Sequence, residues 1–362
     1  MAGPLEGVRV LEFAGLGPAP FAAMLLSDMG AEVLRIDRPG DQTGGSHDLL
    51  GRGRRSLAVD LKSPAGIEQC LEILDNADVL IEGFRPGVME RLGLGPAEVS
   101  TRNPRLIYAR MTGWGQDGPL AQAAGHDINY IAITGALADI GAKEGVPVPP
   151  LNLLGDFGGG SLYLAFGIVA ALFERMTSGQ GQVIDAAIVD GTASLMTMFS
   201  GLTANGFAMR RGANILGGAA HFYRCFKCSD GRHIAVGALE PRFYRLLLDL
   251  AGVELEHRPG QCADAWAEGN RQFEALFANR TRDEWCRLLE GSDACFAPVL
   301  EVEEAPSHPH NVARATFVEA FGVVQPAPAP RFSRTPGLIQ GPPPRSDEGG
   351  AAMAAQWRTR GR

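Results

Sequence analysis

Residues 8–36, VRVLEFAGLGPAPFAAMLLSDMGAEVLRI, decide the fold of this chain. Residues 8–13 are an apolar run typical of a buried strand, and residues 15–18 (GLGP) predict a turn. Residues 21–29 have the apolar spacing of an amphipathic helix, and residues 32–36 predict a second strand. A strand, a helix and a strand in that order predict two parallel strands joined by a right-handed crossover.

The same alternation continues along the N-terminal half. We expect further strands at residues 56–61, 79–82, 106–111 and 182–187, and helices at 64–74 and 86–91. A glycine-rich run at residues 155–160 leads into a long apolar helix that ends at residues 178–181, and another helix is expected over 189–207. The pattern predicts a Rossmann-like, doubly wound α/β domain with a parallel sheet.

The pattern changes after residue 222. A hairpin is expected over residues 222–236, a helix begins at Glu240-Pro241, and Thr281 with Glu284 forms a capping box. We therefore predict a large α/β domain at 1–187, a linker helix and loop at 188–221, a small α+β domain at 222–303, a linker at 304–329, and a return to the large domain at 330–362. The Pro-, Gly- and Ala-rich tail after Gly341 is expected to be poorly ordered.

The composition is that of a soluble globular protein. The chain has 362 residues and a net charge of −8, which argues against a nucleic-acid partner. Its start lacks a charged n-region and an apolar h-region, and the longest apolar run, residues 162–172, looks too short and too glycine-rich to span a bilayer. Six scattered cysteines fit reduced thiols. We therefore expect a cytoplasmic protein that binds neither nucleic acid nor a membrane.

Three motifs resemble known sites but each lacks a part. Gly15-Leu16-Gly17 resembles a dinucleotide fingerprint, but Pro20 occupies the third glycine position and removes a backbone donor. Cys225-x-x-Cys228 has no second cysteine pair, and His308-Pro309-His310 has no carboxylate or cysteine to complete a metal site. A nucleotide on the large domain is still expected, but nicotinamide chemistry and a metal site are not.

Three groups of polar residues could carry chemistry: the pair His126 and Asp156, the single residue Glu240, and a set of arginines. His126 stands directly ahead of a helix start at which Asp127 is the expected N-cap, and Asp156 stands ahead of the next helix. Imidazole beside a helix end that favours negative charge suits proton transfer on a carbonyl compound. Taken singly, His126, Asp156 and Glu240 are also explained as ordinary residues of helix boundaries. Arginines after successive strands suit a phosphate or diphosphate, although each alone could be a solvated surface residue: Arg38, Arg52, Arg54, Arg55, Arg85 and Arg91.

Eight sequence segments together make a specific resemblance. They are LRIDRPG (34–40), GRGRRSL (51–57), FRPGVMERLGL (84–94), NPRLIYAR (103–110), AGHDINY (124–130), PLNLLGDF (150–157), GALEP (237–241) and SDAC (292–295). With these segments the chain resembles the α-methylacyl-CoA racemases, a branch of the CoA-transferase family that includes formyl-CoA transferase. The resemblance covers residues 5 to about 335.

The resemblance implies a role for particular residues. Asp156 matches the carboxylate that forms acyl anhydrides in the transferases and acts as an acid/base in the racemases, opposite a histidine that is here His126. Glu240 is implied to support that histidine. The resemblance implies that the acyl-CoA substrate is bound by Arg38, Val59, Asp60, Leu61, Lys62, Gly83, Phe84, Arg85, Arg91, Gly125, His126, Asp127, Ile128, Asn129 and Tyr130. The resemblance further implies an interlocked homodimer and no cofactor, because CoA is part of the substrate.

The expected reaction is a 1,1-proton transfer at C2 of a 2-methyl-branched acyl-CoA. His126 and Asp156 would act from opposite faces, and the backbone N–H of Asp127 would stabilise the enolate. CoA transfer between carboxylic acids, with Asp156 as nucleophile, and an acyl-CoA-binding protein without activity are the alternatives. One departure bears on the acyl group: residues 217–223 read GGAAHFY where racemases usually carry Asp-Gly-Gly-Ala-Pro-Phe-Tyr.

Overall fold

The computed structural model describes residues 3–41, 44–45, 48–207 and 210–359. The chain divides into two compact units, each described here by itself. The large unit comprises Met1–Thr134, Pro150–Met196 and Val312–Arg362, and the small unit comprises Gly135–Pro149 and Thr197–Asn311. The predicted domain boundaries had placed 135–149 in the large domain and the chain from 312 to 329 in a linker.

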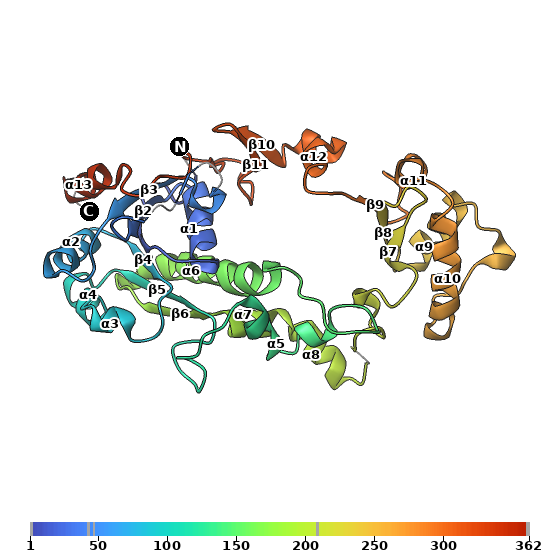
Figure 1. The fold of residues 1–362 in the computed structure, drawn as a ribbon, viewed down its shortest axis with the longest axis horizontal. Coiled ribbons are helices and arrows are strands. Elements are labelled where there is room, and N and C mark those ends of the chain that lie inside the picture. The colour runs from blue at the N-terminus through green and yellow to red at the C-terminus, as the bar shows by residue number, and fades with distance from the viewer. Residues whose placement is uncertain (1–2, 42–43, 46–47, 208–209, 360–362) are drawn as a thin grey trace. The chain divides into compact units, whose positions relative to one another are not determined.

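A six-stranded parallel sheet organises the large unit (Figure 1). Its strand order is β3-β2-β1-β4-β5-β6, and every neighbouring pair is parallel. The strands are β1 (Arg9–Phe13), β2 (Glu32–Asp37), β3 (Arg54–Ala58), β4 (Val79–Glu82), β5 (Ile107–Thr112) and β6 (Val183–Ala187). This confirms the predicted doubly wound α/β class. The strand order reverses between β1 and β4, where the carboxyl ends of such sheets leave a crevice for ligands.

Helices cover both faces of the sheet. They are α1 (Pro18–Asp28), α2 (Pro64–Leu74), α3 (Val88–Arg91), α4 (Pro96–Arg102), α5 (Asp127–Ala132), a π-helix (Leu153–Ser161), α6 (Leu162–Ser178) and α7 (Ile188–Leu195). Successive strand residues enter opposite cores: Val10 packs with α1 and α6, whereas Leu11 packs with α2. Burial on both faces explains the near-continuous apolar strands.

The C-terminal segment returns to the large unit and ends in a packed helix. The antiparallel hairpin β10 (Phe317–Ala320) and β11 (Val323–Pro326) follows α12 (Pro309–Arg314), and α13 (Gly350–Thr359) packs near β3 and α2. Trp357 is fully buried and its Nε1 donates to Glu32 Oε2 at 2.6 Å. The prediction of a poorly ordered tail was therefore wrong for the residues described here, because one large aromatic side chain offsets an otherwise small-residue composition.

The small unit is an α+β structure with an aromatic core. Its antiparallel sheet has the order β7 (Tyr223–Lys227), β8 (His233–Gly237) and β9 (Phe296–Val299), with α8 (Thr197–Ala204), α9 (Pro241–Leu250), α10 (Trp266–Phe277) and α11 (Arg282–Leu289). The predicted hairpin and the capping box of Thr281 and Glu284 are both present. The single helix predicted over 189–207 is in fact two, because the chain leaves helical geometry at Met196 between α7 and α8.

The π-helix and α6 form one continuous helical stretch. At 26 residues, Leu153–Ser178 is long and apolar enough to cross a membrane by length and composition alone, so the prediction that this region is too short was wrong. A core helix of a globular domain passes the same test, and Leu164, Ile168 and Ala171 do pack in the sheet core. Only 33% of the most apolar part of this stretch is buried, so its other face is exposed.

Candidate active site

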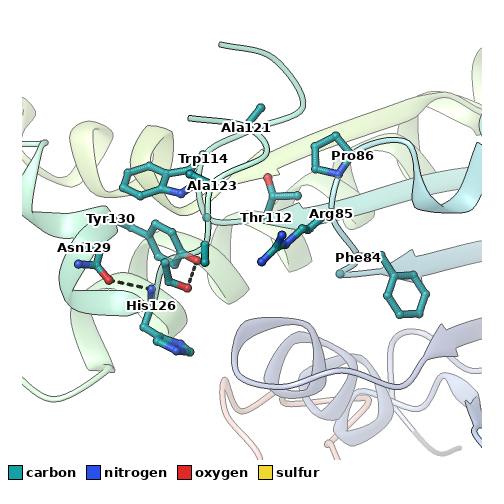
Figure 2. A pocket seen from close by; sticks show the side chains of 14 residues that line it. Phe84, Arg85, Pro86, Thr112, Trp114, Ala121, Ala123, His126, Asn129 and Tyr130 are labelled. Atoms are coloured by element: carbon teal, nitrogen blue, oxygen red, sulfur yellow. Dashed lines mark hydrogen bonds between the residues drawn. The ribbon is translucent and has the colours of Figure 1, made fainter. Parts of the chain in front are cut away.

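A cleft lies at the carboxyl edge of the sheet, around the ends of β4 and β5. It consists of an outer cavity of about 530 Å³ (Figure 2) and an inner cavity of about 220 Å³. The two cavities share lining residues and are therefore adjoining: Gly83, Thr112, Gly113, Gly125, His126 and Tyr130. Arg85 lines the outer cavity and Asp156 the inner one. The topology thus places the cleft where doubly wound sheets bind ligands.

His126 begins helix α5 and faces the cleft. It is exposed, and its backbone N–H donates to Asn129 Oδ1 at 3.0 Å (Figure 2). His126 is the N-cap, and Asp127 is the first helical residue. The prediction of Asp127 as N-cap was wrong by one position, because Asn129 accepts from the N-cap N–H and the Asp127 carboxylate binds elsewhere.

Asp156 lies inside the π-helix Leu153–Ser161, and not ahead of a helix as predicted. π-Helical turns are rare and are frequent at functional sites. Asn152 Nδ2 lies 3.4 Å from Asp156 Oδ2, and a Cβ added to Gly17 would lie 3.1 Å from the same oxygen. Burial raises the pKa of Asp156, the charge of Asp127 raises it further, and the Asn152 hydrogen bond and His126 oppose this shift. A raised pKa favours the protonated form, which is the form that can deliver a proton.

Aromatic residues form one wall of the cleft. Tyr130 OH donates to the Gly125 carbonyl, and the Trp114 ring meets the Tyr130 ring edge-on at 4.7 Å between centroids. A Cβ on Gly113 would lie 2.0 Å from Tyr130 Cζ, so glycine is required where β5 leaves the sheet. Burial, and then the charge of Asp156, raise the pKa of Tyr130. Thr112, Trp114 and residues 15–19 were not predicted as residues of this site, although their places at the end of β5 and directly after β5 and β1 were a usable signal.

The predicted CoA-binding positions fall into two groups. Gly83, Phe84 and Arg85 line the outer cavity, with the Phe84 N–H held by Glu82 Oε2 at 2.8 Å. Arg38, Asp60, Lys62 and Arg91 are exposed but are not among its lining residues, and Leu61 is half-buried. The Val59 side chain is 3% exposed and packs in the core, so only its backbone could face a ligand.

Two of the arginines proposed for a phosphate are structural. Arg54 is 1% exposed and is paired with Glu12, and Arg52 is 3% exposed and is paired with Asp28. Arg52 also donates to Gln325 Oε1 at 2.9 Å. The prediction that these two arginines gather around a phosphate was therefore wrong, because buried carboxylates already pair with them.

Glu240 was predicted to support His126. It is the exposed N-cap residue of α9 and belongs to the small unit, whereas His126 and Asp156 belong to the large unit. Among the described residues, no three His, Cys, Asp or Glu side chains form a group that could hold a metal ion.

Comparison with known proteins identifies the family. The family described as CoA-transferase family III matches residues 5–349. The chain belongs to CoA-transferase family III. Within this family, the α-methylacyl-CoA racemase of Mus musculus is 50% identical over 337 residues, which cover 92% of this chain and 88% of that protein. The α-methylacyl-CoA racemase of Homo sapiens is 46% identical with the same coverage.

The fold of CoA-transferase family III is also found in solved structures. A CAIB/BAIF family protein from Brucella suis superposes with a TM-score of 0.85 at 24% identity, covering 99% of this chain and 100% of the other. At that identity the likeness concerns the fold alone. The sequence-based recognition of the family is thus confirmed by the family match and the two racemases.

Proposed function

We propose that this chain epimerises the C2 centre of 2-methyl-branched acyl-CoA thioesters by a 1,1-proton transfer, without a cofactor. The observation that carries the proposal is that His126 and Asp156 line the same 220 Å³ cavity. The 50% identity with the α-methylacyl-CoA racemase of Mus musculus supports the same reaction. An imidazole and a carboxyl group at one cavity supply the two acid/base groups that the reaction needs.

The proposed reaction proceeds through an enolate. Neutral His126 removes the α-proton of one epimer and leaves the enolate, and protonated Asp156 then delivers a proton to the opposite face of C2. For the other epimer, ionised Asp156 removes the α-proton and protonated His126 delivers one. A positioned acid/base group contributes about 10²–10⁴ in rate. The Asp127 backbone N–H, which as the first helical N–H has no partner within α5, is the proposed donor to the enolate oxygen.

CoA is proposed to bind along the loops that follow the strands. Arg85 at the outer cavity and the exposed cations Arg38, Lys62 and Arg91 supply positive charge for the phosphates. The segment Val59–Lys62 and the turn Gly83–Arg85 would contact the nucleotide and pantetheine parts. Phe84 is held by the buried Glu82, so that turn is fixed before the ligand arrives.

An interlocked homodimer is proposed as the functional assembly, with Glu240 of the small unit supporting His126. The exposed face of α6 supports an apolar partner, because five large apolar residues recur at spacings of four and three: Leu162, Phe166, Val169, Phe173 and Met176. Phe166, Phe173 and Met176 are 73%, 74% and 82% exposed. A cytoplasmic location without nucleic-acid or membrane partners is proposed from the charge of −8 and from the six cysteines, which are all free.

CoA transfer between carboxylic acids, with Asp156 as nucleophile, is the second candidate because the family carries that activity in its name. His126 at the same cavity favours proton transfer, since an anhydride mechanism on Asp156 needs no second base.

One experiment separates these functions. A single epimer of a 2-methylacyl-CoA is incubated with the protein in D₂O, with and without an added carboxylic acid. Epimerisation with deuterium at C2 is expected, and His126→Ala should abolish it while CoA binding is retained. Movement of CoA to the added acid without C2 exchange would replace the proposal with CoA transfer. Binding without either reaction would leave an acyl-CoA-binding protein.

A further inference from the structure

Asp127 and its neighbour His126 place their side chains in different environments. His126 is exposed and lines both cavities of the cleft, whereas Asp127 is 9% exposed and lines neither. The two residues are consecutive at the start of α5. The Asp127 carboxylate therefore lies in the interior of the large unit and not in the cleft.

The Asp127 carboxylate binds the backbone next to Asp156. Its Oδ1 accepts the Asp156 N–H at 2.6 Å, and the Gly155 backbone also hydrogen-bonds to it. A Cβ on Gly155 would lie 2.2 Å from that oxygen and 2.8 Å from Ile131 Cγ2. This close approach of α5 and the π-helix therefore requires glycine at 155.

The backbone carbonyl of Asp156 is also hydrogen-bonded. Ser161 is fully buried, and its Oγ lies 2.8 Å from the Asp156 carbonyl oxygen and 2.7 Å from that of Pro18. Asp156 is thus bound at its N–H by a charged acceptor, which makes the stronger kind of hydrogen bond, and at its carbonyl by a hydroxyl. Both contacts leave its carboxyl group free to face the inner cavity.

We propose that the Asp127 carboxylate is a positioning residue that couples α5 to the π-helix and so fixes the His126 imidazole relative to the Asp156 carboxyl group. This inference rests on the proposed proton transfer. Two bases that act on opposite faces of one carbon must both be in reach at once, and a misplacement of about 1 Å can cost about 10²-fold in rate. Asp127 is the one side chain that is both covalently adjacent to His126 and hydrogen-bonded to the Asp156 backbone.

The charge of Asp127 provides a readout that a merely structural role would not move. The ionisable groups that act on Asp156 are Asp127 and His126, and Asp156 in turn acts on Tyr130, which Arg85 also faces. Asp127 raises the pKa of Asp156 and His126 lowers it, although burial is the largest cause of its shift. Replacing Asp127 by the isosteric Asn removes the charge and keeps an acceptor oxygen. The pKa of Asp156 should then fall.

The test compares Asp127→Ala and Asp127→Asn with the wild-type full-length protein in epimerisation of both epimers. For Asp127→Ala we expect kcat to fall about 10²-fold, with KM and the Kd for CoA within about twofold. For Asp127→Asn we expect a smaller loss of kcat. In the reaction direction in which ionised Asp156 is the base, the acid limb of the pH profile of kcat/KM for Asp127→Asn should move to lower pH than in the wild type. Asp117→Asn, an exposed carboxylate between β5 and α5, should match the wild type.

Several outcomes would overturn this role. If both variants keep the wild-type kcat, Asp127 does not position His126 relative to Asp156. An equal loss in both variants with an unmoved pH profile, or a loss of CoA binding in proportion to kcat, would mean that Asp127 only supports the fold. If Asp127→Ala fails to give a cooperative thermal transition, the pH profile of Asp127→Asn decides. A wild-type protein without C2 exchange would instead contradict the proposed function, so the two failures are distinguishable.

Discussion

At the scale of single residues, burial separates arginines that look alike in the sequence. Arg54→Met should lower the free energy of unfolding by about 3–5 kcal/mol, because it leaves the fully buried Glu12 carboxylate without its partner. Urea denaturation followed by circular dichroism measures this loss. Arg38→Met, the same change at an exposed site, should leave stability within about 0.5 kcal/mol and raise KM for acyl-CoA. Equal stabilities of the two variants would contradict the structural role of Arg54.

A buried histidine gives the small unit a dependence on pH. His221 is fully buried, its Nε2 lies 2.8 Å from Tyr244 OH, and that hydroxyl donates to the Pro259 carbonyl. Nε2 therefore carries the proton, and Nδ1 has no partner among the described residues. Burial lowers the pKa of His221 from 6.5 to about 4. Since the unfolded chain binds the proton first, stability from this group is present above about pH 6.5 and is lost as the pH falls toward about 4.

His221→Phe should remove that dependence. The wild type should lose on the order of 3 kcal/mol more than the variant between pH 7 and pH 4, measured by thermal unfolding at each pH. His257→Phe, at an exposed histidine, is the control and should follow the wild type. Identical pH dependence of His221→Phe and the wild type would refute the assignment. This residue stands where racemases usually have proline, so the departure in the sequence has a physical consequence.

At the scale of elements, the π-helix is held by the packing of α7 against it. A Cβ on Gly191 would lie 1.8 Å from the Gly159 carbonyl oxygen, so the two backbones are in contact. Gly191→Ala should cost about 1–3 kcal/mol of stability and reduce kcat by displacing Asp156. Gly201→Ala on α8 meets nothing within 4 Å and should be neutral or stabilising by about 0.5–1 kcal/mol. Retained stability and kcat in Gly191→Ala would show that the π-helix does not depend on this contact.

Elements with a strong periodic signal could be predicted from the sequence, and elements fixed by long-range contacts could not. The βαβ unit at residues 8–36 and the capping box at Thr281 were correct because their determinants are local. The π-helix around Asp156 arises from packing against α7 and from Asp127, which lies 29 residues earlier. Helix α13 depends on Trp357 reaching Glu32 across 325 residues. The sequence pattern around a residue does not indicate a partner that is so distant in the chain.

The candidate site shows the same division. His126, Asp156, Tyr130 and Arg85 were identified from motifs, and the structure places all four on one cleft. The burial of Arg52 and Arg54 could not be read from the sequence, since a charged residue in a loop motif looks the same whether it faces solvent or a buried carboxylate. The contact of the Asp127 side chain was also missed, because its partner, the Asp156 N–H, lies 29 residues later in the chain.

At the scale of the whole molecule, the apolar stripe on α6 predicts self-association. Phe166→Glu combined with Phe173→Glu should convert the protein from a dimer to a monomer in sedimentation velocity, because charges replace apolar side chains that are 73% and 74% exposed. Epimerase activity should fall with the dimer, since Glu240 is proposed to act across it. Leu255→Glu, at a residue that is 80% exposed in the small unit, should remain a dimer. A dimer in the double variant would contradict this interface.

The large unit is assembled from three separate stretches of the chain, and this order has a consequence during synthesis on the ribosome. Arg52 hydrogen-bonds to Gln325, 273 residues later, and the Gly53 N–H donates to the Gly341 carbonyl at 2.9 Å. The small unit ends at Asn311, so all of its residues leave the ribosome before Gln325 and Gly341 do. The N-terminal strands of the large unit are therefore synthesised without these two C-terminal partners, and the whole sequence of the small unit follows before the partners appear. Premature termination after residue 311 would release a chain with a complete small unit and an incomplete large one.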